Sequence, residues 1–204
     1  MNNTFDFKKY YPDLRDPSTL SLILSNILTI VLAIVQNWDF LTTLLVYWSQ
    51  SVIIGFFCYL RMRSLKNFTT EGLTFNGIPV PEGTSSRNMV ASFFAFHYGI
   101  FHILYFFFIS FFAYLGAEID MKHVGIGALI FFLNHLYSYL YNRRKVSTKK
   151  ENIGYIMFFP YLRVIPMQFT IVFGLPLPLF LVLKSAIDVV MHTIDQKRND
   201  TTSV

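Results

Sequence analysis

Long apolar segments alternate with short polar ones along this chain. A helix needs about 20 residues, at a rise of about 1.5 Å each, to cross the hydrocarbon core of a bilayer. Six segments approach or exceed this length: 19–36, 39–60, 89–115, 124–141, 153–174 and 177–193. The pattern predicts an all-α fold, a polytopic transmembrane bundle of about six helices.

Prolines crowd the last two apolar segments. Pro176 and Pro178 predict a tight turn between the fifth and sixth helices. Pro160 and Pro166 fall inside the fifth segment and predict a kinked helix, because proline removes a backbone donor and clashes with the preceding turn.

Composition supports a membrane environment. Hydrophobic residues make up 53% of the chain and charged residues 14%, whereas soluble domains carry about 25% charged residues. The formal charge of +5 need not imply nucleic acid, because Lys and Arg lie in short segments between apolar runs. We therefore expect the lipid bilayer as partner, and no nucleic acid. A single cysteine, Cys58, can form no disulfide within the chain.

The basic residues also predict an orientation. They concentrate in every second connection between the six apolar segments. Connections rich in Lys and Arg usually stay on the cytoplasmic side of the membrane. Residues 1–18 and 195–204 become cytoplasmic tails, and 19–194 the transmembrane domain. We expect a multi-pass protein of the cell (plasma) membrane with both termini in the cytoplasm.

The longest predicted loop, 61–88, is also cytoplasmic in this topology. It contains Asn76-Gly77, a dipeptide typical of tight turns. The loop is therefore either a small hairpin or lid, or an ordinary connection.

Polar residues recur inside the apolar segments at similar depth. A charge in the bilayer centre costs about 2.5–3.5 kcal/mol on insertion scales, so ionisable residues there usually have a function. The candidate site residues are Gln50, His97, His102, Tyr161, Arg163, Lys184, Asp188 and His192. His135, beside Asn134, is interpreted as a packing residue.

The sixth segment gives the sharpest pattern. Lys184, Asp188 and His192 follow at intervals of four residues and share one helix face. Lys184 can pair with Asp188, and that carboxylate can also orient the imidazole of His192. The alternative is a buried ion pair that only fixes helix packing.

A metal site is the weaker hypothesis. It would use His97, His102, Asp188 and His192. The imidazoles of His97 and His102 point about 140° apart on an ideal helix, so they would converge only if the helix is distorted at Gly99. Either histidine can instead be a packing residue.

Arg163 implies a partner of opposite charge. Its guanidinium stays protonated, and the flanking prolines indicate a segment that faces the bundle interior. Arg163 and Lys184 together exceed the one carboxylate, Asp188. Either Lys184 is neutral, or an anionic ligand such as a phosphate, a carboxylate or a lipid headgroup completes the site.

Four functions stay open. The first is a membrane protein that binds a small ligand, ion or anionic headgroup at this polar site. The others are a membrane-embedded enzyme that uses a metal or cofactor, a small transporter or channel subunit acting as a homodimer, and a structural or assembly protein. No nucleophile motif, acidic metal motif or phosphate loop identifies an enzyme class or requires a cofactor.

Several short motifs resemble those of one family. They are Tyr47-Trp48-Ser49-Gln50 with Gly55, Phe96-His97-Tyr98-Gly99 with Phe101 and His102, Pro160-Tyr161 with Arg163, and Lys184 with Asp188. From about Ser21 to His192 the chain resembles an uncharacterised prokaryotic integral membrane family, the domain of unknown function 6498. The resemblance implies the same clustered positions and no substrate. The family often has Glu where this chain has Gln50, which argues against a proton or metal role there.

Overall fold

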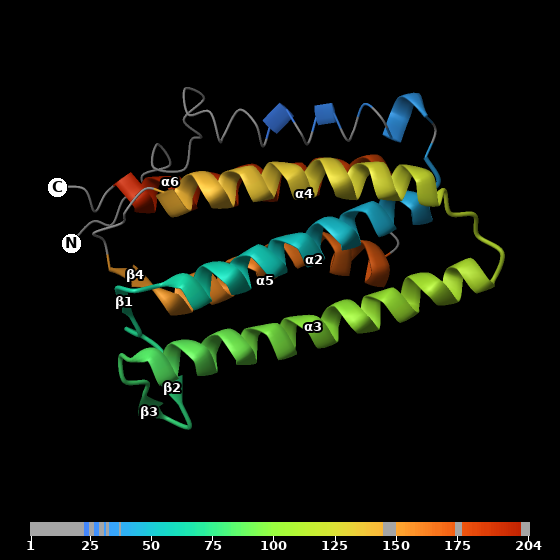
Figure 1. Ribbon diagram of the computed structural model, residues 1–204. Coiled ribbons are helices and arrows are strands. Elements are labelled where there is room, and N and C mark those ends of the chain that lie inside the picture. Colours follow the sequence, from blue (N-terminus) through green and yellow to red (C-terminus); the bar gives the residue numbers. More distant parts are fainter. Residues whose placement is uncertain are drawn as a thin grey trace, which may run out of the picture.

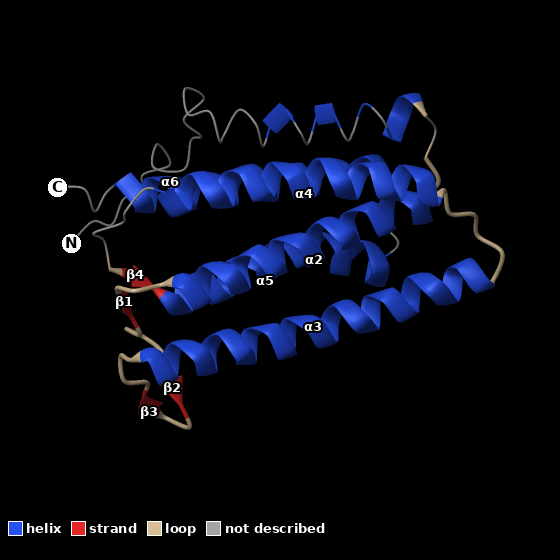
Figure 2. Cartoon of the chain, viewed as in Figure 1, coloured by secondary structure: helices blue, strands red, loops and turns tan. Residues whose placement is uncertain are grey.

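The computed structural model describes residues 23–24, 27–28, 31, 33–36, 38–144, 150–173 and 177–200. These residues are mainly helical (Figure 2). The long helices are α2 (Phe40–Ser64), α3 (Thr84–Tyr114), α4 (Met121–Arg144), α5 (Ile153–Phe173) and α6 (Leu177–Asp200). The described residues between 23 and 35 are also helical. Half of the first predicted segment, the N-terminal tail and residues 201–204 lie outside the described residues, and only the backbone is described for 195–200.

Among the residues that the structure describes, three helices are long and apolar enough to cross a membrane. They are α2, α3 and the Met121–Leu140 part of α4. The apolar part of α5 that was searched, Ile153–Ile165, is shorter. The helical fold is thus confirmed, and the count of six spans stays a prediction.

Helix α2 occupies the centre of the bundle. It packs against α3, α4 and α5, while α5 also packs against α3 and α6 (Figure 1). Within its most apolar window, 61% of the residues of α2 are buried, against 28% for α3 and 11% for α4. The outer helices therefore turn long apolar faces away from the protein.

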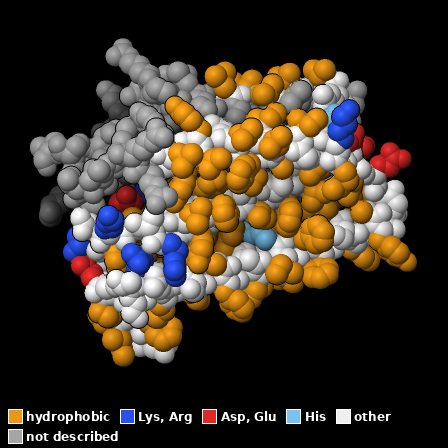
Figure 3. Space-filling model, in the orientation of Figure 1, with side chains coloured by type: hydrophobic (Ala, Val, Ile, Leu, Met, Phe, Trp, Pro, Cys, Tyr) orange, Lys and Arg blue, Asp and Glu red, His pale blue; other side chains and the backbone are white. Residues whose placement is uncertain are grey.

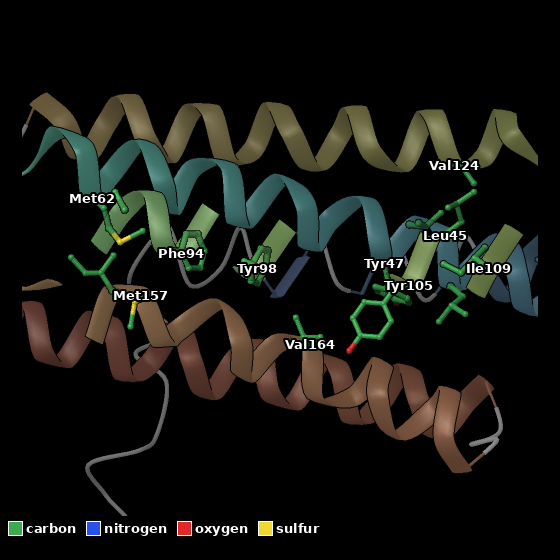
Figure 4. Packing of buried hydrophobic residues seen from close by; sticks show 14 of the residues in the cluster. Leu45, Tyr47, Met62, Phe94, Tyr98, Tyr105, Ile109, Val124, Met157 and Val164 are labelled. Carbon is green, nitrogen blue, oxygen red and sulfur yellow. The ribbon is translucent and has the colours of Figure 1, made fainter. Parts of the chain in front are cut away.

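The core lies between α2 and its neighbours (Figure 4). Phe94 of α3, Met62 of α2 and Met157 of α5 are all buried in it. Gly55 of α2 lets the ring of Tyr98 on α3 approach closely, because a Cβ there would lie 2.8 Å from its Cδ1 atom. This close approach brings the polar hydroxyl of Tyr98 into the middle of an apolar interface.

Local sequence signals define several helix ends. The carboxylate of Asp120 accepts hydrogen bonds from the backbone N–H of Lys122 (2.9 Å) and His123 (3.1 Å) where α4 begins. The N–H of His123 is the main cause that holds the pKa of Asp120 below its usual value. The side-chain oxygen of Asn152 accepts from Gly154 (2.9 Å) at the start of α5. Gly116, with φ of 96°, follows the end of α3 in the left-handed conformation.

The long loop contains a small hairpin, one of the two predicted alternatives. Strands β2 (Thr74–Phe75) and β3 (Ile78–Pro79) pair antiparallel. Asn76 and Gly77 form the turn with φ of 51° and 78°. Positive φ at both central residues matches the twist of a two-residue hairpin, and Asn-Gly adopts it at little cost.

A second strand pair joins distant loops. β1 (Phe68–Thr69) lies parallel to β4 (Glu151–Asn152), just before α5. Beside it, the guanidinium of Arg61 donates to the carboxylate of Glu151 at 2.9 Å. The loop between α2 and α3, which spans only 65–83 because both helices extend into polar sequence, is thereby tied to the entry of α5.

The proline predictions have different outcomes. Helix α5 continues without interruption past Pro160 and Pro166, so neither proline ends it, and the kink stays a prediction. The predicted turn at Pro176 lies outside the described residues.

The surface is divided by residue type. On the face shown in Figure 3, hydrophobic side chains cover the middle of the molecule, and charged side chains gather toward its two ends. The outer helices carry exposed large apolar residues, among them Phe93, Phe96 and Ile103 of α3 and Leu129 and Leu133 of α4.

Candidate functional site

Four of the predicted site residues meet between α2, α5 and α6. We call Gln50, Arg163, Lys184 and Asp188 the interior cluster. The ammonium of Lys184 lies 2.7 Å from a carboxylate oxygen of Asp188 and donates to the amide oxygen of Gln50 at 3.1 Å. The guanidinium Nε of Arg163 lies 3.5 Å from the other oxygen of Asp188. The pairing predicted from the four-residue spacing on α6 is therefore observed.

The cluster is enclosed by protein. Asp188 is 1% exposed, Gln50 3% and Lys184 8%. The Lys184 ammonium also lies over the ring of Tyr47, 4.6 Å from its centroid. A buried ion pair holds only when further polar groups and dipoles compensate the lost hydration, and Gln50 and Tyr47 supply such contacts.

A small cavity opens against the cluster. Its volume of about 20 Å³ is room for one water molecule or one monatomic ion. It is lined by the interior cluster together with Tyr47, Ser51, Ile54 and Val164. The space excludes a substrate of several heavy atoms in this conformation.

His102 belongs to a neighbouring network. Its Nδ1–H donates to the carbonyl oxygen of Tyr98 at 2.8 Å, which leaves Nε2 to accept from the Ser51 hydroxyl at 2.9 Å. The Tyr98 hydroxyl donates to the carbonyl oxygen of Ser51 at 3.0 Å and lies 2.8 Å from the Ser51 Oγ. Ser51 thus touches both this network and the cavity of the interior cluster.

His97 and Tyr161 form a pair at the surface of α3 and α5. The imidazole Nδ1 lies 2.8 Å from the Tyr161 hydroxyl, and the ring stacks on Phe93 at 5.4 Å. His97 is exposed, so it does not belong to the enclosed cluster. His135 packs against Phe131, with ring centroids 4.2 Å apart, as expected for a packing residue.

The metal hypothesis gains no support from the described residues. Among them, no three His, Cys, Asp or Glu side chains gather where they could hold a metal ion. His97 and His102 bind separate partners. The side chain of His192 lies outside the described part, so its predicted contact with Asp188 stays a prediction.

Sequence reasoning assigned no site role to Ser51, Tyr98 and Tyr47, although Tyr47 and Tyr98 stand in the motifs that carry the family resemblance. All three are uncharged polar residues in apolar segments, where Ser and Tyr are common. The i, i+4 spacing of Ser51 and Gly55 offered one clue, since small residues one turn apart let helices approach closely.

The Ser51→Ala substitution is expected to lower the free energy of unfolding by about 1–3 kcal/mol, because it leaves the His102 Nε2 buried without a donor. Unfolding of purified protein in mixed micelles with rising dodecyl sulfate measures the change. The matched control is Ser64→Ala, which removes an exposed serine from the end of the same helix. Equal stability of the two variants would contradict a structural role for the network.

Neither the curated proteins nor the solved structures contain a significant match to this chain. A family profile matches residues 11–204, nearly the whole chain. The resemblance to the domain of unknown function 6498 is thereby confirmed. The chain belongs to a family of unknown function, DUF6498.

Proposed function

We propose that this chain is an integral membrane protein that binds a small inorganic anion at the interior cluster. The observation that carries the proposal is two cations, the buried Lys184 and the partly buried Arg163, that share one carboxylate beside a cavity. Arg163 and Lys184 both contact Asp188, so the described charges of the cluster sum to +1. A buried net charge is costly, and a counter-ion in the cavity offsets that cost.

The membrane part of the proposal rests on the helices and the surface. Three helices of the described part have the length and hydropathy of spans, and on the face shown in Figure 3 exposed apolar side chains lie between charged ends. Six spans, a position in the cell membrane and cytoplasmic termini complete the topology that we propose from loop charge.

The size of the cavity narrows the ligand class. A volume of about 20 Å³ accommodates a monatomic anion such as chloride and excludes a lipid headgroup or an organic acid. Tyr47, Gln50 and Ser51 add polar groups to its lining. Hydroxyl and amide N–H groups can donate to an anion without adding charge.

Binding is tested by titrating sodium chloride into purified protein kept in sodium gluconate. We expect the thermal unfolding temperature to rise with chloride and to remain unchanged with further gluconate, which is too large for the cavity. Arg163→Gln reduces the cluster charge to zero and should weaken chloride binding at least about tenfold. Asp188→Asn raises the charge to +2 and should strengthen binding of the folded protein by a similar factor.

Opposite effects of the two variants separate binding from packing. If the cluster only fixes packing, both variants lose stability and neither changes the chloride dependence. Arg63→Gln, an exposed residue of the last turn of α2, is the matched control for loss of one positive charge. A chloride response equal in wild type and Arg163→Gln would contradict the proposal.

A hydrolase is the second candidate, favoured by one contact. The Ser51 Oγ and His102 Nε2 lie 2.9 Å apart, the geometry of a nucleophile and its base. Ser51 is buried and the adjoining space holds one water molecule. Labelling of wild type but not Ser51→Ala by a fluorophosphonate would establish this activity. We expect no labelling, because the probe cannot reach the hydroxyl.

A further inference from the structure

A second polar cavity lies at one end of the bundle, where α2 ends and α3 begins. It is formed by the loop 65–83, the first turn of α3 and Lys150. Its volume of about 490 Å³ far exceeds the space at the interior cluster and falls in the range of small-molecule sites.

The lining of this cavity is basic. Lys66, Arg87 and Lys150 face it together with one carboxylate, Glu82, for a formal charge of +2. The ammonium of Lys150 lies 2.7 Å from Glu82. That hydrogen bond is the main cause of a lowered pKa at Glu82, so the carboxylate stays ionised and engaged with Lys150. Lys66 and Arg87 therefore supply the excess positive charge.

Arg87 is held in place with donor capacity remaining. One terminal nitrogen donates to the carbonyl oxygen of Leu65 at 2.7 Å, and the other lies 3.5 Å from Asn88. Its Nε–H has no acceptor among the described residues, but that atom is buried, so the donor capacity left for a ligand is the second N–H of each terminal nitrogen. A guanidinium already fixed by its surroundings loses less conformational freedom when it binds an anion.

The N-terminus of α3 opens on the same cavity. Gly83 is the N-cap and Thr84 the first helical residue, and both line the space. Glycine has no side chain to accept hydrogen bonds from the first-turn amides, and that turn contains no acidic residue. The positive end of a 31-residue helix thus adds to the three cations.

We propose that this cavity binds a phosphate ester anion, supplied by the headgroup of an anionic phospholipid. The charge and the donors suit a phosphate oxygen. The location favours a lipid as the source, because the cavity joins the end of one candidate span to the beginning of the next. When both helices cross a bilayer, their ends and the cavity between them lie at the depth of the lipid headgroups.

The hairpin at the same end strengthens the case for a lipid (Figure 1). Phe75 and Ile78 flank its turn and are 63% and 70% exposed. Apolar and aromatic side chains at headgroup depth are stabilised by the interface. A free phosphate in solution would gain nothing from these two residues, whereas a membrane-bound lipid lies within the layer that they enter.

Lipid binding by the full-length protein in detergent micelles tests the proposal. Phosphatidylglycerol, which is anionic, is compared with zwitterionic phosphatidylcholine by native mass spectrometry. We expect phosphatidylglycerol to bind at least about tenfold more tightly. Lys66→Gln should weaken phosphatidylglycerol binding at least about threefold. The double variant Lys66→Gln/Lys150→Gln should lower lipid occupancy by more than the sum of the two single substitutions.

The control variants remove the same charge outside the cavity. Arg63 is exposed at the same end of the bundle, and Lys122 is exposed at the other end. Arg63→Gln is matched to Lys66→Gln, and the Arg63→Gln/Lys122→Gln pair to the double variant. Both controls should change binding less than twofold. Arg163→Gln at the interior cluster should also leave lipid binding unchanged, which separates the two sites.

The outcomes also distinguish the source of the phosphate. Selective phosphatidylglycerol binding that millimolar inorganic phosphate does not displace supports the lipid. Displacement by inorganic phosphate, with the same dependence on Lys66, supports the phosphate site and assigns it to a free ion. Equal effects of Lys66→Gln and Arg63→Gln would reduce the binding to general surface attraction and overturn the proposal, as would equal affinity for the two lipids.

Discussion

Replacement of Asp188 by Leu is expected to lower the free energy of unfolding by about 3–5 kcal/mol. Asp188 is 1% exposed and contacts both Lys184 and Arg163. The substitution leaves the buried Lys184 and the partly buried Arg163 beside each other without a carboxylate, so Lys184 must lose its charge, or the two cations must repel each other or draw in water. Unfolding in mixed micelles, followed by helical circular dichroism, measures the loss.

A double substitution is the control for this prediction. Lys184→Met removes one cation, so Lys184→Met with Asp188→Leu should cost less than the sum of the two single changes by at least about 1 kcal/mol. Asp120→Leu, at an exposed helix start, removes a carboxylate outside the core and should cost less. A loss below about 1 kcal/mol for Asp188→Leu would contradict the account of the cluster as a coupled buried ion pair.

Gly55→Ala is expected to destabilise the protein by about 2–3 kcal/mol. The new Cβ would lie 2.8 Å from the Cδ1 of Tyr98, closer than atoms of this kind pack. The ring cannot swing away freely, because Phe94 stacks against it at 4.9 Å and Tyr161 lies edge-on at 5.4 Å. Retreat of Tyr98 would also break its hydrogen bond to Ser51. The same mixed-micelle titration measures the effect.

Glycines with open surroundings provide the comparison. A Cβ on Gly99 of α3 or Gly125 of α4 would meet nothing within 4 Å. Gly99→Ala and Gly125→Ala should be neutral or slightly stabilising, because alanine favours a helix over glycine by up to about 1 kcal/mol. Equal losses at Gly55 and Gly99 would show that the close approach of Tyr98 carries no energetic weight.

The sequence predicted helices well where apolar runs are long. The segments at 39–60, 89–115 and 124–141 correspond to α2, α3 and α4. Each observed helix extends beyond its apolar run, because hydropathy reports burial in lipid or core and not the end of backbone hydrogen bonding. Thr84 to Asn88, for example, is polar yet helical. Turn chemistry at Asn76-Gly77 indicated a turn, but the dipeptide alone did not decide between a hairpin and an ordinary connection.

Contacts between the candidate residues could be predicted from the sequence within one helix and less completely between helices. The four-residue spacing of Lys184 and Asp188 predicts that they pair on one helix face. Arg163 was expected beside them because a charged residue in an apolar segment needs a partner of opposite charge. The packing of α2 and α3 sets the rotation of each helix about its axis, and this rotation decides which of its faces meets the interior cluster. The sequence therefore placed His97 in the interior, whereas it lies on an exposed surface beside Tyr161. The role of Ser51 depended on Gly55 and Tyr98 and was missed.

The short parallel pair of β1 and β4 limits how many times the chain between these strands can cross a membrane. Phe68 and Glu151 are direct neighbours across it. In any bilayer that the bundle crosses, the chain between them must therefore pass through an even number of times. The two helices in that interval, α3 and α4, satisfy this together and could not do so singly. The pairing of these two short strands thus constrains the path of the chain through a membrane independently of loop charge.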